Sequence, residues 1–483
     1  MKALKHYFDG RQLFDDNKRE KGIAEVEQAV QLDPNFAEAY KMLGIQQYRN
    51  QQSEQGEKSL GKAISLSNTI GLPERQKFDM RYYYYAKNDQ AKKTLNLLKM
   101  WNQLYPNDYI PYYRLYSIYS NRKEYKVAEE FVIKAIDNGH IARSLPRMAT
   151  LCALQGRYEE ALEYLQRFEQ EYPHKAKINT SMGRLYQRMG KLDKALEYFE
   201  AIQLLQPNDP YAIGNVAYVQ TNLGNIDEAE KLYLEALSKA KLPQDSSSVT
   251  QWMLYFYGTI GQLENYEKYL WMTINTRSTF RPPAEAYSIL AWYDHIIFYV
   301  QHGEQKRYRR FLDDYNNRFT RGNDNMACVN KLTFAMATLN LEESKLYGDQ
   351  CIDFFGEVAG KHYVYLFDAL VADMEKDYPE MIAKFEAFID ATGSKEQFWA
   401  SQLARAHRQN GDFQKAYDII KQSLMLSPNS PELCYEMARI CLAMEKNEEA
   451  VKYLQTANKI WRKADPRFKP AQEVREKLAE LAG

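Results

Sequence analysis

The chain has 483 residues, of which 45% are hydrophobic and 27% are charged, and its 64 Lys and Arg residues equal its 64 Asp and Glu residues. This balance excludes an overall electric field that would attract nucleic acid or an anionic membrane, so we expect no nucleic-acid partner. No stretch approaches the roughly 20 apolar residues that a membrane span needs, and the amino terminus lacks the apolar core of a secretion signal, so we expect a soluble chain.

Residues 1–240 carry a sequence repeat of constant period. Alanine returns at this period at Ala161, Ala195 and Ala229, each time shortly after a glycine and within an apolar pattern of helical period. The spacing matches the period of about 34 residues that is typical of helix-turn-helix units, in which small residues occupy the points where two helices cross closely. The pattern therefore predicts an array of helix pairs.

Glycines and prolines extend this array towards the amino terminus. Four glycines, two of them in first helices and two in second helices, repeat with the same period: Gly10, Gly22, Gly44 and Gly56. Five prolines are expected just after second helices, where a residue that cannot continue a helix ends one unit: Pro34, Pro106, Pro173, Pro207 and Pro428.

The repeat weakens after residue 240. Residues 241–250 contain Pro243 and three serines, and this composition predicts a loop that acts as a hinge between two halves. Residues 251–395 keep the helical period without the small-residue signature, so we expect diverged helix pairs there.

The repeat returns near the carboxyl end. Ala416 and Ala450 are again one period apart, which predicts a further pair of units over residues 396–465. Residues 466–483 place Val474, Leu478 and Leu481 on one face of a helix and charges on the other, as expected of a helix that caps the end of the array.

These repeats resemble the tetratricopeptide family over residues 1–240 and 397–463. The resemblance implies an all-α protein, a right-handed α-solenoid of stacked helix pairs that binds a protein or peptide segment in its concave groove and performs no catalysis. More narrowly, ALKHYFDGRQLF, AVQLDPNFAEAYKMLGIQQY and LLKMWNQLYPNDYIPYYRLYSIY look like the repeat tails of bacterial transmembrane Ser/Thr kinases, adenylate cyclases and related regulators. In that case the chain is the sensory or docking part of a larger signalling protein, with a catalytic or membrane domain before Met1, and lies in the cytoplasm or outside it.

In the tetratricopeptide family, the first helix of each unit lines the groove, and fixed positions of the unit contact the ligand. Registered on the alanines, these positions hold Tyr113, Ser117 and Asn121 in one unit, Arg143 and Thr150 in the next, Thr180, Arg184, Gln187 and Arg188 in the third, and Tyr218, Thr221 and Asn222 in the fourth. Tyr, Arg, Gln and Asn side chains suit hydrogen bonding to an extended peptide and pairing with a carboxylate. The alternative is a solvated face without a ligand.

The family's clamp for the acidic tails of heat-shock chaperones is absent. Lys41 occupies one position of that clamp, but Ile45 stands where the clamp needs Asn. Arg184 and Arg188, one helical turn apart, remain able to bind an acidic ligand in another geometry.

Aromatic residues support a second hypothesis, a sensor that binds a small molecule or glycan in the diverged region. Nine aromatic residues gather there: Trp252, Tyr255, Phe256, Tyr257, Trp271, Trp292, Tyr293, Phe298 and Tyr299. Aromatic residues are enriched at binding hot spots, but they also fill cores, and core packing is the more frequent role. The same alternatives apply to the four consecutive tyrosines, residues 82–85.

We find no metal, cofactor or catalytic motif in the sequence. His295 and His302 are seven residues apart, which is not the spacing of helical zinc ligands. The five cysteines are odd in number and lack close pairing, which predicts buried structural thiols and favours a reducing compartment such as the cytoplasm. A third hypothesis is a structural spacer that self-associates, but the polar carboxyl-terminal helix argues against end-to-end growth and favours a monomer.

Overall fold

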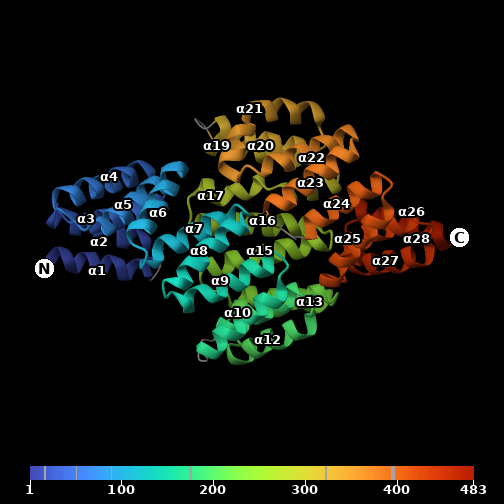
Figure 1. Cartoon of the computed structure of the whole chain (residues 1–483), viewed down its shortest axis with the longest axis horizontal. Coiled ribbons are helices and arrows are strands. Elements are labelled where there is room, and N and C mark those ends of the chain that lie inside the picture. Colours follow the sequence, from blue (N-terminus) through green and yellow to red (C-terminus); the bar gives the residue numbers. More distant parts are fainter. Residues whose placement is uncertain are drawn as a thin grey trace. The chain divides into compact units, whose positions relative to one another are not determined.

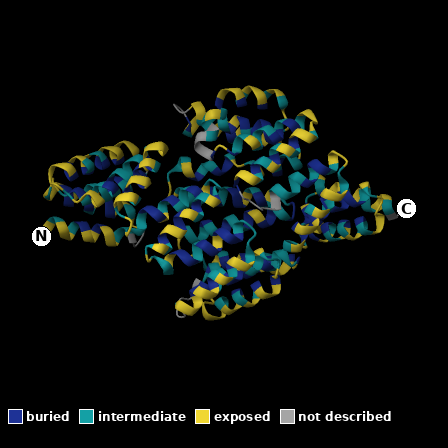
Figure 2. Cartoon of the chain, viewed as in Figure 1, coloured by how far each residue is buried: buried dark blue, intermediate teal, exposed yellow. Residues whose placement is uncertain are grey.

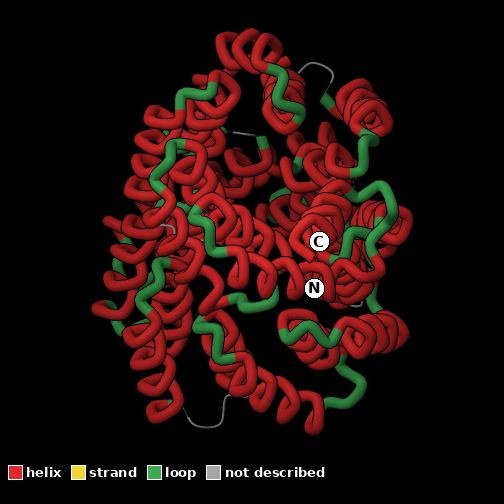
Figure 3. Tube along the Cα trace, turned by 90° about the vertical axis from the view of Figure 1, so that its right-hand side faces the viewer, coloured by secondary structure: helices red, strands yellow, loops and turns green. Residues whose placement is uncertain are grey.

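A computed structural model of the chain describes residues 1–15, 18–50, 52–88, 90–172, 177–320, 324–392 and 397–482. Throughout these residues the regular structure is helical, and the segments between the helices are loops and turns (Figures 1 and 3). In the described part of the chain, no helix combines the length and the apolar character needed to cross a membrane.

Within the described ranges there are 28 α-helices and two short 3₁₀-helices. The first fourteen are α1 (Lys2–Asp15), α2 (Arg19–Leu32), α3 (Ala37–Arg49), α4 (Ser53–Thr69), α5 (Glu74–Lys87), α6 (Ala91–Leu104), α7 (Tyr109–Asn121), α8 (Tyr125–Asp137), α9 (Ile141–Leu154), α10 (Tyr158–Glu171), α11 (Lys177–Arg188), α12 (Leu192–Leu205), α13 (Pro210–Asn222) and α14 (Ile226–Lys239). The others are α15 (Pro243–Thr259), α16 (Leu263–Ser278), α17 (Pro283–Tyr287), η1 (Ser288–Ala291), α18 (Tyr293–Gln301), α19 (Gln305–Phe319), α20 (Asp324–Ala337), α21 (Leu341–Ala359), α22 (Tyr363–Glu375), α23 (Tyr378–Thr392), α24 (Gln397–Gln409), α25 (Phe413–Leu426), α26 (Pro431–Ala443), α27 (Asn447–Ile460), η2 (Trp461–Lys463) and α28 (Lys469–Ala482).

The helices pack as consecutive pairs. The most extensive contacts join the two helices of a pair, such as α3 with α4 or α13 with α14, and smaller contacts join each pair to the next. Buried and exposed residues alternate along most helices, so each helix turns an apolar side towards its neighbours (Figure 2). The fold is therefore an all-α solenoid of tetratricopeptide-type helix pairs, as the period of the alanines and glycines predicts.

The glycines inside the first helices have the predicted packing role. A Cβ atom on Gly10 would lie 2.6 Å from Val26 and 3.0 Å from the carbonyl oxygen of Gly22. A Cβ atom on Gly44 would meet the Gly56 carbonyl oxygen at 2.9 Å. Since real Cβ atoms do not approach other atoms so closely, only glycine permits this helix crossing.

The chain forms two compact units, which we describe separately. The first unit comprises Met1–Ile118, Glu130–His140 and Ser278–Ala286, and the second comprises Tyr119–Glu129, Ile141–Arg277 and Tyr287–Gly483. In the first unit, small apolar clusters link neighbouring helices, for example Tyr7 of α1 with residues of α2 and α3. The boundary between the units does not fall in the hinge predicted at residues 241–250.

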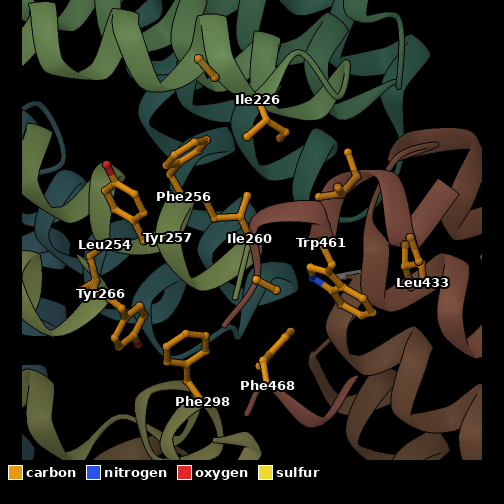
Figure 4. Close-up of a cluster of buried hydrophobic side chains, with 14 of the residues drawn as sticks. Ile226, Leu254, Phe256, Tyr257, Ile260, Tyr266, Phe298, Leu433, Trp461 and Phe468 are labelled. Carbon is orange, nitrogen blue, oxygen red and sulfur yellow. The ribbon is translucent and has the colours of Figure 1, made fainter. Parts of the chain in front are cut away.

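The second unit has a large apolar cluster that extends from Leu192 to Val474, and a smaller one that includes Leu332 and Phe385. Two short segments, residues 425–429 and 461–468, which we call the closing segments, join the carboxyl-terminal helices to the turns of the middle helix pairs. The Trp461 indole N–H donates to the Thr259 carbonyl oxygen at 2.9 Å, and the Asp465 backbone N–H donates to the Gly261 carbonyl oxygen at 2.9 Å. Figure 4 shows Trp461 and Phe468 packed among Ile260 and Phe298.

Two sequence predictions about local structure are wrong. Residues 243–250 are not a loop but the first turns of α15. Pro243 is the first residue of that helix, where its missing N–H costs nothing, and Ser248 Oγ donates to the Gln244 carbonyl oxygen at 3.0 Å. The four tyrosines at 82–85 are half-buried rather than in the core, and the Arg114 guanidinium lies 3.7 Å from the Tyr82 ring centre.

The remaining expectations about elements have mixed outcomes. All regular structure among the described residues of 251–395 is helical, as predicted. Helix α28 lies within the predicted capping segment, and its Val474 is fully buried against the core. Four of the five predicted prolines follow second helices as expected, whereas Pro173 lies outside the described residues.

Candidate functional site

Most predicted groove positions of the second unit lie on the first helices of three successive pairs, α9, α11 and α13, which α15 follows as the first helix of the next pair. These helices stand side by side because each packs against its own second helix and against the following pair. Residues one turn apart on one helix, such as Arg184 and Arg188, therefore share a face with the corresponding residues of the next first helix.

Five of the predicted residues line one cavity of about 510 Å³: Arg184, Gln187, Arg188, Tyr218 and Asn222. The other lining residues are Ala153, Leu154, Tyr158, Asn215, Trp252, Leu426 and Ser427. This volume lies within the range of about 300–1,000 Å³ that is usual for ligand sites.

Arg184 and Arg188 give this cavity its charge. Neither guanidinium forms an ion pair with a carboxylate among the described residues. Burial lowers the pKa of Arg184, and the like charge of Arg188 lowers the pKa further. Both side chains are exposed, and two like charges that lack a carboxylate partner in the described part of the chain favour the binding of an anion.

Uncharged polar groups occupy the floor between the arginines. The side chains of Gln187 and Asn215 make no hydrogen bond with another described residue, so their amide groups are available to a ligand. The Asn222 side chain instead donates to the Tyr218 carbonyl oxygen at 2.8 Å. The side chain of Tyr218 is 41% exposed and reaches into the cavity.

Trp252 forms an apolar wall of the cavity. A Cβ atom on Gly214 would lie 2.1 Å from the indole ring, so the absence of a side chain at Gly214 makes room for the tryptophan. The ring of Tyr211 meets the indole edge to face, with ring centres 5.8 Å apart. The indole is thereby fixed at the side of the cavity and offers an apolar surface to a ligand.

The first closing segment also contributes to the lining, with Leu426 and Ser427. The segment is held by close packing at Gly190, where an added Cβ atom would lie 2.1 Å from the Met425 carbonyl oxygen. It is also held by Asn429, whose side-chain N–H donates to the Asn222 carbonyl oxygen at 2.9 Å. The groove is therefore bounded by the chain's own residues at this edge.

Sequence reasoning missed these two wall residues. Leu426 is the last residue of the second helix α25 and Ser427 follows it, more than two hundred positions after Arg184. A repeat period reports contacts between neighbouring units only. Trp252 was considered for the small-molecule hypothesis, and Gly214 is the sequence signal that would have linked it to the groove.

The other predicted groove residues do not line this cavity. Thr150 lines a smaller cavity of about 160 Å³ together with Arg184 and Arg188, and its hydroxyl donates to the Pro146 carbonyl oxygen at 2.8 Å. Thr221 donates to the Ala217 carbonyl oxygen at 2.9 Å. Three further residues stand on their helices outside the cavity: Asn121, Arg143 and Thr180.

Tyr113 and Ser117 belong to the first unit. Tyr113 is 43% exposed, and the Ser117 hydroxyl donates to the Tyr113 carbonyl oxygen at 2.8 Å. They are not part of the cavity described above.

Histidine and cysteine residues serve the packing of the second unit. His302 is buried, and its ring contacts the carbonyl oxygens of Phe298 and Gly261 at 2.8 and 3.3 Å. Among the described residues no group of His, Cys, Asp and Glu is arranged to hold a metal ion. All five cysteines are free, and Cys328 is half-buried whereas the other four are buried.

The aromatic residues of the diverged region divide between core and surface. Phe256, Tyr257, Phe298 and Tyr299 are buried in the apolar cluster. Trp271 is half-buried against Phe311, at a centre distance of 5.1 Å. Trp292 is 39% exposed and stacks on His295 with ring centres 5.5 Å apart.

Comparisons with known proteins agree with a repeat fold. The family model described as "Anaphase-promoting complex, cyclosome, subunit 3" matches residues 374–457, and a "Tetratricopeptide repeat" model matches residues 153–214. The first range contains the first closing segment, and the second range contains the arginine pair. The matches and the helix pairs support a tetratricopeptide-type repeat protein.

A curated protein also matches part of the chain. "Anaphase-promoting complex subunit 3" of Schizosaccharomyces pombe is 27% identical over 166 residues, which cover 34% of this chain and 24% of that protein. The chain thus spans about a quarter of the length of its curated relative. The narrower resemblance to repeat tails of bacterial receptors stays a prediction, since neither family match concerns them.

Two solved structures resemble the chain only loosely. A crystal structure of the APC/C hetero-tetramer Cut9-Hcn1 aligns with 100% of this chain and 97% of its own, at 12% identity and a TM-score of 0.34. The yeast Tom70 structure aligns with 99% of this chain and 95% of its own, also at 12% identity and a TM-score of 0.34.

Proposed function

We propose that this chain is an interaction scaffold whose cavity between α11, α13 and α15 holds a peptide or protein segment, without catalysis. The observation that carries the proposal is the gathering, in one preformed cavity, of Tyr218, two amide side chains and two guanidiniums that have no carboxylate partner among the described residues. Such groups bind a backbone and acidic side chains. Among its described lining residues are no carboxylate, histidine or cysteine that would act as a general base or nucleophile.

The mechanism rests on preorganisation. The helices that carry the cavity residues are fixed by the packing of the repeats, and Trp252 is fixed by Gly214 and Tyr211. A partner segment therefore bears most of the ordering entropy, and the scaffold loses little. The curated relative is named as a subunit of a complex, which agrees with a role in binding other proteins.

Site-specific cross-linking tests this proposal. Tyr218 is replaced by a photo-reactive phenylalanine analogue, the full chain is irradiated in a lysate of its source organism, and the attached peptides are identified by mass spectrometry. We expect a defined partner segment that is attached much less in the Arg184→Ala, Arg188→Ala background. The matched control is Arg167→Ala, Arg318→Ala, which removes two charges from exposed ion pairs outside the cavity.

The control should retain the cross-link. If the cavity variant and the control give the same cross-linked peptides, the arginines do not hold the segment and the proposal is wrong. If no peptide is attached and Trp292 fluorescence instead responds to small molecules, the sensor hypothesis gains the support that the groove hypothesis loses.

A further inference from the structure

The arginine pair concentrates charge in a chain that is neutral overall. The sequence carries 64 basic and 64 acidic residues, yet the described lining of the cavity contains two arginines and no acidic residue. Other arginines of the second unit pair with carboxylates, as Arg408 does with Glu436 at 2.6 Å and Arg405 with Asp373 at 2.8 Å. Since no described residue supplies a counter-charge to Arg184 and Arg188, the geometry favours an external one.

The spacing of the pair sets the charge of the ligand group. Residues four apart on a helix have Cβ atoms about 5–6 Å apart, so both guanidiniums reach a single small group or two adjacent ones. One negative charge would leave the pair with a net charge of about +1. A group with two negative charges relieves the repulsion completely, and each planar guanidinium can donate two parallel hydrogen bonds to it.

We propose that the cavity recognises a doubly negative group on the bound segment, such as a phosphorylated side chain or two adjacent carboxylates. This inference rests on the proposed function of the cavity. It adds the chemical class of the partner, which the repeats alone do not give.

The other residues that line the cavity suit a doubly negative group and the residues beside it in a bound peptide. Gln187 and Asn215 offer amide N–H donors to its outer oxygens, and Trp252 offers an apolar face to the adjacent side chain. Leu426 and Ser427 also line the cavity, and its volume of about 510 Å³ is sufficient for a short stretch of an extended chain.

Matched peptide arrays test the charge requirement with the full chain. Each peptide is printed in four forms that differ at one position: phosphoserine, serine, a single glutamate, and two adjacent glutamates. We expect retention of the phosphoserine and double-glutamate forms, at least tenfold above the serine form. Arg184→Gln with Arg188→Gln should remove this preference, with about a tenfold loss of affinity per arginine, while Arg167→Gln with Arg318→Gln should keep it.

The pH dependence separates the two sources of the double charge. The second ionisation of a phosphate monoester has a pKa near 6, so binding of phosphopeptides should weaken below about pH 6. Binding of the double-glutamate peptides should persist to about pH 4.5, because carboxyl groups titrate near pH 4.

Each outcome decides the question. Equal retention of the serine and phosphoserine forms on the wild-type chain would overturn the charge requirement while leaving peptide binding intact. Inorganic phosphate that binds, measured by calorimetry, while every peptide form fails would instead show a site for a free anion and overturn both proposals. A preference that survives loss of both arginines would place the recognition elsewhere and refute the inference.

Discussion

The turn glycines of the two units differ in what they contact, although both units also have glycines inside helices. In the first unit, Gly10, Gly22, Gly44 and Gly56 lie inside helices and allow the two helices of a pair to cross closely. In the second unit, glycines with positive φ form the turns between paired helices, at residues 190, 224 and 261. Each of these turns lies against the residues near or within the closing segments.

In the first unit, a Cβ atom on the turn glycines Gly71 and Gly139 would meet nothing within 4 Å. This difference teaches that the same kind of turn can stay open or can receive a second part of the chain. The first unit also has a contact between distant segments, a hydrogen bond from Arg19 to the Phe280 carbonyl oxygen at 3.3 Å.

The largest effect should come from Trp461→Ala. The Trp461 side chain is fully buried in the large cluster, and its loss should destabilise the second unit by about 3–5 kcal/mol. Because the indole contacts Thr259, amide exchange should accelerate in α15 and α16 as well as in α27. The comparison is Leu60→Ala in the first unit, whose exchange changes should stay within α3–α5. Changes confined to α26–α28 would show that the second unit is not closed by this contact.

The second-largest effect should be a loss of stability of the second unit at acidic pH. Burial lowers the pKa of His295 to about 3, well below the ordinary value of about 6.5. Between these values the unfolded chain binds a proton that the folded chain does not, so stability is full above pH 6.5 and falls as the pH decreases. The slope should approach about 1.4 kcal/mol per pH unit and should be absent in His295→Gln. Identical slopes in denaturant titrations of the two proteins would refute this assignment.

Two alanine substitutions at turn glycines sharpen the comparison further. Gly190 and Gly411 both have left-handed backbone, with φ of +71° and +87°, so each should lose about 1–2 kcal/mol from strain. Only Gly190 faces the Met425 carbonyl oxygen, whereas a Cβ atom on Gly411 would meet nothing within 4 Å. Gly190→Ala should therefore lose about 1–3 kcal/mol more. Equal unfolding midpoints for the two variants would mean that the first closing segment moves to accommodate the added methyl group at little cost.

The smallest effect should come from Asp227→Asn. Hydrogen bonds from Lys463 and Arg462 lower the pKa of the Asp227 carboxyl group. Its contribution is thus present at neutral pH and lost as the pH falls below about 4. Since all three side chains are exposed, high salt should erase the difference from wild type. A difference that persists in high salt would indicate that the pair acts through packing instead.

The sequence alone predicts the helix pairs of this fold better than the contacts made by the closing segments. The spacing of Gly10 and Gly22 identifies a helix crossing because that contact lies within one repeat. The register also selects Arg184, Arg188 and Tyr218, which share a cavity because neighbouring first helices stand side by side. Pro243 was misread as a break because proline both ends and begins helices.

The contacts of the closing segments leave no such signal. Trp461 and Thr259 are 202 positions apart, and no period links them. A tryptophan after the last regular helix pair reads equally well as a local core residue. Only the folded chain shows that it completes the packing around Ile260.

The closing segments also set the order in which this chain can finish folding during synthesis. The early helix pairs find most of their partners within a few dozen residues and can pack while the ribosome is still translating. The turns at Thr259 and Gly261 wait for residues 461–468, about 202 positions later in the chain. Closing so long a loop is slow, and until those residues are synthesised the apolar edge around Ile260 stays open to chaperones and to aggregation.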